Sequence, residues 1–379
     1  MKIEVAKADL EAALGIAAIT VGAGADLSSH YLFRIRGEGV EVLSFDVRGF
    51  SCSPLAASFE GDSGDAFTVE SWRLDKWVSG VGDGTLTLKA LEGDVHASGP
   101  RSKVRFRSLD PSKFPFWDDL LSSAEDVGSV SPASLGRALN LARWFVSADD
   151  TSKPELCQVE AIDGVLWATD RRALSSVEIP VLPDLNVRIP GKDVGSVIRF
   201  LDDKETAGRD VIIRSACRTP EDGGGACAVF IRPDGCYVGV TRPTSQFPKL
   251  DVNRDAEDEA LLKIDKDEFN AGISVLLASA PKGHESVTFK CSSDQVSLSM
   301  PSEAGGRDEY PLSLASLTGG EEYEFTIDFP YLQGIAETFG LDSLSLGLNR
   351  RGRGGFVAFR SEDEGENANC YYTVIVWRT

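Results

Sequence analysis

Two stretches of the chain close in the same way: Ser108-Leu109-Asp110-Pro111-Ser112-Lys113-Phe114-Pro115 and Thr241-Arg242-Pro243-Thr244-Ser245-Gln246-Phe247-Pro248. Each follows a run in which apolar and polar residues alternate, which predicts a strand. Each then carries a proline shortly before a final Phe-Pro. About a third of the 379-residue chain separates the two phrases. A repeat of this length predicts three copies of one domain, the last of which is closed by the C-terminus.

The order of predicted elements supports this repeat, because the sequence strand, helix, strands recurs six times. Apolar residues at helical spacing predict helices over 9–19, 71–78, 131–147, 192–201, 267–280 and 331–339. Alternating runs predict strands over 3–5, 31–36, 40–45, 67–69, 85–90, 103–108, 158–162, 165–169, 187–189, 210–215, 226–232, 237–241, 262–264, 286–291, 295–300, 323–327, 343–348, 356–360 and 371–377. Such a series predicts an α+β fold with helices on one face of antiparallel sheets.

Composition limits the classes of function that the chain can have. The formal net charge is −20, which disfavours tight, nonspecific binding of nucleic acid by the whole surface. Seven scattered cysteines without a CxxC pair predict reduced thiols in a cytoplasmic protein, and three distant histidines give no zinc spacing. Charged residues near the start argue against a signal peptide, and no apolar run reaches the length of a membrane span.

Three fragments that suggest other activities lack the residues around them that the activity needs. Gly61-Asp62-Ser63-Gly64 has no triad context, so a hydrolase using Ser63 is a weak alternative. Arg350-Arg351-Gly352-Arg353-Gly354-Gly355 lies between two predicted strands and favours a hairpin tip over an RNA-binding segment. Gly223-Gly224-Gly225 lacks the lysine of a phosphate loop and opens no helix.

Four stretches of the chain together carry a family resemblance. They are the opening strand from Met1 with its helix, 102–115, Ala168-Thr169-Asp170-Arg171-Arg172-Ala173-Leu174, and Phe247-Pro248 with the tail 372–379. In this order and at this spacing they resemble the bacterial DNA polymerase III β subunit, the sliding clamp, over the whole chain at low identity. The chain resembles a divergent member of that family, from a bacterium or a phage.

The resemblance implies three tandem clamp domains, 1–122, 123–252 and 253–379. It also implies a head-to-tail homodimeric ring with helices lining the hole. Duplex DNA would thread the ring regardless of sequence, and a clamp loader would open it. The replicative polymerase would be tethered to it as to a processivity factor, because tethering raises its effective concentration at the DNA. The resemblance implies no catalytic residue, no metal and no cofactor. A repeat-built interaction scaffold that does not encircle DNA is the alternative.

The resemblance implies a groove for partner peptides between the second and third domains. By motif position it would be lined by Thr169, Leu174, Pro248, Ile375 and Trp377. Packing of these residues within the core is the alternative. Arg171, Arg172 and Ala173 replace Gly-His-Arg of the family, and Val376 replaces a proline, which suggests a different peptide preference.

The resemblance also implies a dimer interface, and alternation and charge in this sequence agree with it. Arg101, Lys103, Arg105 and Arg107 recur at every second residue and are expected on one face of a strand, with Val104 and Phe106 on the other. The family pairs this strand with an acidic edge of the partner's third domain, where this chain carries Glu303, Asp308 and Glu309. Residues 253–379 hold twice as many acidic as basic side chains, which fits that pairing. A solvated basic face is the alternative.

Basic side chains on the predicted helices are candidates for contact with DNA phosphates. They are Arg73, Lys76, Arg137, Arg143, Lys192, Arg199, Lys266 and Lys282. Acidic residues are as numerous on the same helices, so ordinary exposed side chains are the alternative for each.

Overall fold

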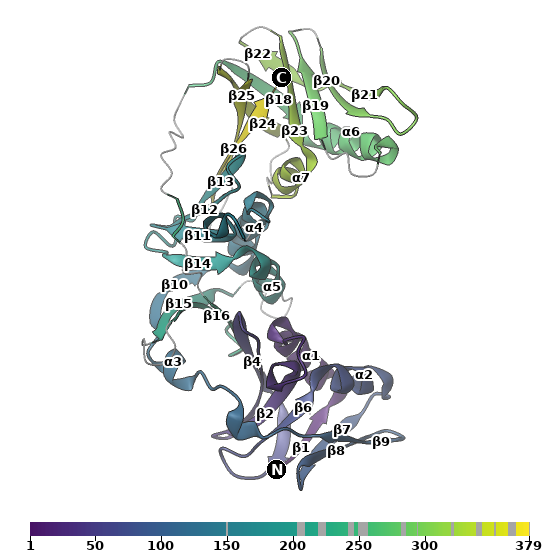
Figure 1. Ribbon diagram of the computed structural model, residues 1–379, viewed down its shortest axis with the longest axis vertical. Helices are drawn as coiled ribbons and strands as arrows, with labels where there is room; N and C mark the ends of the chain where they lie inside the picture. The colour runs from purple at the N-terminus through teal and green to yellow at the C-terminus, as the bar shows by residue number, and fades with distance from the viewer. Residues whose placement is uncertain are drawn as a thin grey trace. The chain divides into compact units, whose positions relative to one another are not determined.

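In the computed structural model the predicted order of strand, helix and strands recurs along the chain (Figure 1). The structure describes residues 1–148, 151–202, 209–218, 225–241, 246–248, 257–281, 286–293, 295–319, 322–338, 343–351, 354–362 and 369–378. These residues fall into two compact units, Met1–Pro132 with Ser196–Thr244 and Ala133–Gly195 with Ser245–Thr379. Each unit combines strands from two of the three domains predicted from the sequence, whose boundaries stay a prediction.

The first third of the chain contains two such series. They are β1 (Lys2–Ala6), α1 (Lys7–Ala17), β2 (His30–Arg36), β3 (Gly39–Phe45), β4 (Gly49–Leu55) and β5 (Ala57–Glu60), then β6 (Ala66–Glu70), α2 (Ser71–Gly80), β7 (Thr85–Leu91), β8 (Asp94–Gly99) and β9 (Ser102–Arg107). A short helix, α3 (Asp118–Ser122), follows. Helix α1 buries Leu10, Ala13, Leu14 and Ala17, the residues whose spacing predicted it.

The remaining two thirds repeat the order. The middle third holds β10 (Glu125–Val130), α4 (Pro132–Ala142), β11 (Gln158–Ile162), β12 (Val165–Thr169), β13 (Ala173–Glu178), β14 (Val187–Pro190), α5 (Gly191–Leu201), β15 (Val211–Arg218), β16 (Gly225–Ile231) and β17 (Tyr237–Thr241). The last third holds β18 (Ala260–Asp265), α6 (Lys266–Ser279), β19 (Ser286–Cys291), β20 (Val296–Pro301), β21 (Arg307–Leu312), β22 (Ser316–Thr318), β23 (Tyr323–Asp328), α7 (Phe329–Thr338), β24 (Ser343–Arg351), β25 (Gly354–Glu362) and β26 (Cys370–Arg378). The predicted α+β class is therefore confirmed.

In each third the first strand of one half pairs with a strand of the other half. Thus β1 pairs with β7 and β6 with β2, β10 with β15 and β14 with β11, and β18 with β24 and β23 with β19. This exchange locks the two halves of each third together, because neither half completes its sheet alone.

Strands from neighbouring thirds are joined edge to edge. In the first unit β4 pairs antiparallel with β17, which makes one eight-stranded sheet. In the second unit β13 pairs antiparallel with β26, which makes a nine-stranded sheet. In each joint the last strand of a three-stranded ladder pairs with the last strand of the next third. The ladders are β2-β3-β4 and β11-β12-β13, and their partners are β17 and β26. Strand β9 is one edge of the five-stranded sheet β5-β1-β7-β8-β9, and β21 is one edge of the four-stranded sheet β21-β20-β19-β23.

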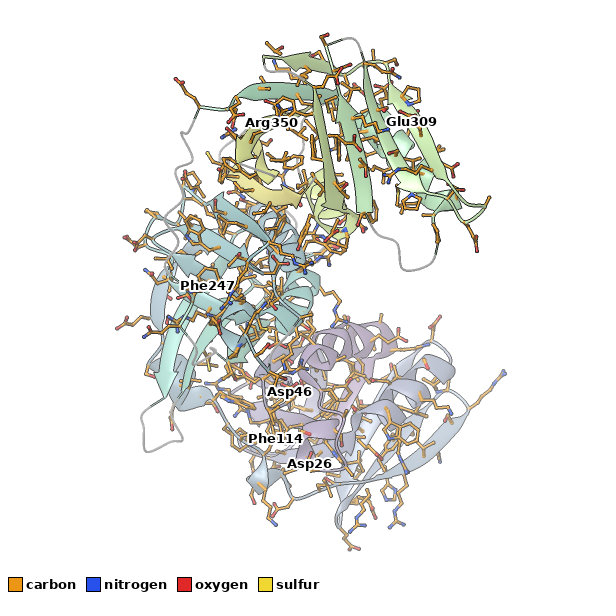
Figure 2. The ribbon with its side chains drawn as sticks, turned by 45° about the horizontal axis from the view of Figure 1, so that its top comes forward. Asp26, Asp46, Phe114, Phe247, Glu309 and Arg350 are labelled. Atoms are coloured by element: carbon orange, nitrogen blue, oxygen red, sulfur yellow. The ribbon has the colours of Figure 1, made fainter. Side chains whose placement is uncertain are left out.

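The phenylalanines of the repeated phrase are both buried (Figure 2). Phe114 packs its ring against Phe45, Phe116 and Trp117 in the first unit. Close by, the guanidinium of Arg34 binds the carboxylates of Glu41 and Asp118 at 2.7 and 2.6 Å, which holds α3 against the sheet. The phrase therefore supplies a packing anchor after a last strand.

Candidate functional site

A cavity of about 290 Å³ lies in the second unit, where elements from the middle and last thirds of the chain meet. Its lining residues are Arg171, Arg172, Thr326, Ile327, Asp328, Tyr331, Ile375 and Val376. They come from the turn between β12 and β13, the end of β23, the first turn of α7 and the last strand β26. The cavity therefore depends on the β13–β26 joint, because that pairing brings the turn beside the C-terminal strand.

The turn between β12 and β13 is held by its own polar groups. The Asp170 carboxylate accepts hydrogen bonds from the backbone N–H groups of Arg172 and Ala173 at 2.8 and 2.9 Å. The Thr169 hydroxyl donates to the carbonyl of Ala173 at 2.7 Å and accepts from the N–H of Arg171 at 3.1 Å. Arg171 has a φ of 77°, in the left-handed region that L-residues with side chains rarely adopt.

Helix α7 supplies another part of the wall through Tyr331, which contacts this turn. The Tyr331 hydroxyl donates to the second carboxylate oxygen of Asp170, and its ring stacks on Phe145 with centroids 5.2 Å apart. Burial first, and then Asp170, raise the pKa of Tyr331. The phenol therefore remains a neutral hydrogen-bond donor across the physiological range.

The five residues predicted for the groove fall into different places. Ile375 lines the cavity, whereas Thr169 is buried and shapes the turn without lining it. Leu174 and Pro248 are half-buried and lie outside the lining. Trp377 lies in β26 opposite Gly355, and its side chain is outside the described residues.

Sequence reasoning missed the contributions of Thr326, Ile327, Asp328 and Tyr331. These residues sit in an ordinary strand and at the start of an ordinary helix, and nothing in their local pattern distinguishes them. Arg171, Arg172 and Val376 were visible as departures from the family pattern, and the structure places all three in the cavity wall.

The strand predicted to form the interface is an edge strand, β9, with the predicted alternation. Lys103, Arg105 and Arg107 are exposed, while Phe106 is buried and Val104 half-buried. The expectation for Arg101 is wrong: it precedes the strand in a turn, with a φ of 58°. Arg101 is therefore not part of the alternating series of β9.

The predicted acidic partner residues lie on or beside the other edge strand, β21. Figure 2 labels Glu309 on this strand, where its carboxylate accepts a hydrogen bond from Ser297 at 2.5 Å. Hydrogen bonds from the hydroxyls of Ser279 and Ser302 lower the pKa of Asp308, which keeps it charged. Glu303 is exposed in the preceding turn.

The candidate DNA contacts are placed on helices or just after them. Those with exposed side chains are Arg73, Lys76, Arg137, Arg143, Lys192 and Arg199. Lys266 is half-buried, and Lys282 lies outside the described residues. Arg73 pairs with Glu70 at 2.6 Å and Arg143 with Glu337 at 3.7 Å, so part of the charge of these cations is offset within the chain.

The described part of the chain shows the state of its cysteines, its possible metal ligands and the length of its helices. Cys52, Cys236 and Cys291 are buried thiols outside any disulfide, and burial raises the pKa of Cys291 to about 12. No cluster of three or more His, Cys, Asp or Glu side chains suited to a metal occurs among the described residues. Within those same residues, no helix combines the length and apolarity needed to span a membrane.

Solved structures of bacterial sliding clamps share this fold. The DNA polymerase III subunit β of Pseudomonas aeruginosa has 15% identity and a TM-score of 0.78, with all of both chains covered. The sliding clamp of Bacillus subtilis has 14% identity, and that of Bartonella birtlesii bound to griselimycin has 18%; both give a TM-score of 0.80 and cover 100% of this chain and 99% of theirs. No family model and no curated protein matches the chain.

These similarities establish the fold. The chain has the three-domain architecture of the bacterial DNA polymerase III β subunits, and the resemblance predicted from the sequence is confirmed at that level.

Proposed function

We propose that this chain is a non-catalytic DNA sliding clamp of the cytoplasm. Two copies would close head to tail into a ring around duplex DNA and tether a replicative polymerase. A clamp loader would open and close that ring. The observation that carries the proposal is the arrangement of strand edges. Two such edges, β9 and β21, hold the same positions in their thirds as the strands that pair in the two joints inside the chain.

The two internal joints follow one rule. In each, the last strand of a first-half ladder pairs with the last strand of the following third: β4 with β17, and β13 with β26. The strands in the corresponding positions that remain are β21 and β9, both outer edges of their sheets. Because an exposed edge is a template for pairing with another chain, a β21–β9 joint between two copies is the continuation of the same rule.

The side chains on these two edges are complementary in charge. Strand β9 exposes Lys103, Arg105 and Arg107, whereas β21 carries the half-buried Asp308 and the exposed Glu309 after its first residue Arg307, with Glu303 in the turn before it. An antiparallel pairing would also bring Val104 and Phe106 beside Tyr310 and Leu312. Opposite charges favour this head-to-tail orientation and disfavour the pairing of two β9 edges.

Topological attachment agrees with the charge of the chain. A net charge of −20 opposes tight binding to DNA. A closed ring does not need tight binding, because it stays on the DNA by encircling it. The cations on α2, α4 and α5 would make weak, sequence-independent phosphate contacts compatible with sliding.

The cavity at the β13–β26 joint is the proposed site for the polymerase and other partners. It combines the apolar side chains of Ile327, Ile375 and Val376 with a majority of polar residues, so a short peptide could be held by both apolar contacts and hydrogen bonds. Tethering through such a peptide would let the polymerase rebind before it diffuses away.

The test is retention on circular DNA. The protein is loaded onto a nicked circular plasmid with the clamp loader of its host, and free protein is removed by gel filtration. We expect the protein to stay with the circle and to be lost when the plasmid is cut once. Equal loss from circular and linear DNA would contradict a topological clamp and would favour the alternative, an interaction scaffold that does not encircle DNA.

A further inference from the structure

We infer that the exposed face of helix α2 binds single-stranded DNA by stacking an unpaired base on the ring of Trp72. This inference rests on the proposed function and deepens it, since it adds a contact with unpaired bases to the phosphate contacts proposed for α2. A polymerase copies a single strand, so unpaired template lies next to the duplex that a clamp would encircle. The basis is an exposed tryptophan that neighbouring charged side chains hold in a fixed orientation.

Helix α2 carries two tryptophans in different environments. Trp77 is half-buried, its indole N–H donates to the Ser102 hydroxyl at 2.9 Å, and its ring lies edge-on to that of Phe106. Trp72 is 55% exposed and does not pack against the core that Trp77 joins. Covering its large apolar ring with a flat partner would remove apolar area from water, which is favourable. Trp72 is therefore available for a contact that the fold itself does not use.

The carboxylate of Glu70 fixes the orientation of this ring. One of its oxygens accepts a hydrogen bond from the indole N–H of Trp72 at 2.7 Å, and the other pairs with Nε of Arg73 at 2.6 Å. The guanidinium carbon of Arg73 lies 5.1 Å from the centre of the Trp72 ring, in a cation–π contact. Because one carboxylate binds both groups, the ring and the guanidinium form a stacked pair before a ligand arrives. Such preorganisation lowers the entropy lost on binding.

The open part of this ring suits a nucleobase. Trp72 is 55% exposed even with Arg73 over its ring, so a flat ligand can still stack on it. Stacking on aromatic side chains is a common way for proteins to hold single-stranded DNA without reading its sequence. A paired base inside a duplex is covered on both faces by its neighbours. An unpaired base is therefore the form of DNA that Trp72 can bind.

The cations beside the ring match the phosphates that flank a base. Lys76 lies four residues after Trp72 and is exposed on the same side of the helix. Arg73 is also exposed, with its guanidinium against the ring. A protein segment could cover Trp72 too, but two cations beside the ring favour a ligand that carries phosphates. The net charge of −20 keeps such a contact weak, so a sliding ring can break it.

The acidic side chains at this face are engaged by neighbouring donors. The Asp75 carboxylate accepts a hydrogen bond from the Tyr31 hydroxyl at 3.0 Å. Glu70 is bound by the indole N–H and the guanidinium described above. These contacts hold both carboxylates within the protein and leave Lys76 as a cation next to the stacked pair.

The experiment measures binding of two fluorescein-labelled strands by fluorescence anisotropy at low salt. One is an oligothymidylate of about ten nucleotides, and the other is an abasic strand of the same length. The two strands have the same phosphates, so their comparison isolates the contribution of the bases. We expect the oligothymidylate to bind about tenfold tighter than the abasic strand.

Trp72→Ala should abolish this preference, whereas Trp72→Phe should keep most of it, because a phenyl ring also stacks on bases. Phe116→Ala is the matched control. Phe116 is a 44% exposed aromatic side chain of the same unit and also lies beneath an arginine, Arg34. That guanidinium is bound by the carboxylates of Glu41 and Asp118, so Phe116→Ala should keep the preference of the parent protein. Thermal melting would establish that each variant is folded.

Tryptophan fluorescence gives a second readout of stacking. The oligothymidylate should quench the emission of the parent protein, and an added complementary strand should restore it by pairing the bases. Trp72→Phe should bind the oligothymidylate without this quenching. Equal affinities for the two strands, absence of binding by both, an unchanged preference in Trp72→Ala or quenching that persists in Trp72→Phe would overturn the inference.

The outcome is separable from that of the proposed function. Retention on circular duplex DNA requires no unpaired base, so a protein that is retained but binds the two strands equally would keep the clamp and lose this inference. A protein that prefers the oligothymidylate but is lost equally from circular and linear DNA would keep the contact with unpaired bases and lose the clamp.

Discussion

The backbone N–H of Val376 donates a hydrogen bond of 2.9 Å to the carbonyl oxygen of Arg172. It extends the β13–β26 ladder beyond the pair Ala173 and Ile375 into the turn that carries Arg171. The C-terminal strand thereby fixes a turn that lies in the middle of the sequence. One wall of the candidate peptide site exists only because these distant segments pair.

Substitution by glycine should cost little stability at Arg171 and more at Arg172. Arg171 has a positive φ, so Arg171→Gly relieves strain, which offsets the loss of its exposed ion pair with Glu155. Arg172 lies outside the left-handed region, so Arg172→Gly mainly loosens the unfolded chain and costs stability. We expect R171G to be more stable than R172G by about 1 kcal/mol in urea unfolding. Equal stabilities would show that the turn imposes no strain at Arg171.

The pairing of β4 with β17 should be destabilised when Gly239 gains a side chain. Gly239 lies opposite Phe50, and a Cβ built on it would be 2.2 Å from the Phe50 ring. That ring is 2% exposed and stacks on Trp117, so it has little room to move. We expect Gly239→Ala to lower the free energy of unfolding by about 1–3 kcal/mol.

Gly15 in α1 is the matched control for this substitution, since nothing lies within 4 Å of a Cβ built there. Gly15→Ala should be neutral or stabilise by up to about 1 kcal/mol, because alanine favours the helix. Thermal melting of both variants checks the pair of expectations. A Gly239→Ala protein as stable as Gly15→Ala would mean that the joint tolerates a change in backbone spacing.

Asp118 should contribute stability that depends on pH. Its hydrogen bond from Arg34 lowers the pKa of the carboxyl below its usual value. A carboxyl with a depressed pKa in the folded state stabilises above its unfolded pKa of about 3.9, and this stability is lost as the pH falls through the folded value. We therefore expect Asp118→Asn to cost about 1–2 kcal/mol at pH 7 and progressively less below about pH 4.

The neighbouring exposed Asp119 provides the control for this carboxylate. Asp119→Asn should unfold like the parent protein at each pH, because its side chain faces water in both states. Urea unfolding between pH 7 and pH 3 measures both variants. If Asp118→Asn lost the same stability at pH 3 as at pH 7, the ion pair with Arg34 would not be the cause.

The proposed interface should be sensitive to charge on β9. Lys103→Glu combined with Arg107→Glu places like charges opposite Glu309, so sedimentation should show a shift from dimer to monomer. Lys89→Glu, at an exposed position of β7 in the same sheet, should leave the dimer intact. An unchanged dimer in the double variant would remove β9 from the interface.

Much of the fold could be predicted from local pattern. The helix at Leu10–Ala17 followed from its apolar spacing, and β9 followed from the alternation of Lys103, Val104, Arg105 and Phe106. The sequence did not predict β4, β13 and β21, which supply the joints and an outer edge. Strand β13 buries Ser175 and Ser176 completely, and β21 begins with three consecutive charged residues, so neither shows the apolar alternation of a half-buried strand.

The sequence by itself determined the repeated order of elements, the α+β class and the basic alternation of the strand that carries Lys103, Arg105 and Arg107. These follow from periodicity and charge, which act over a few neighbouring residues. Only the tertiary structure decided that Arg101 leaves the basic face, that Thr169 shapes a turn, and that Tyr331 joins Ile375 in one cavity. Those outcomes depend on which distant strand edges pair, because the β13–β26 ladder brings together backbone groups that share no local pattern.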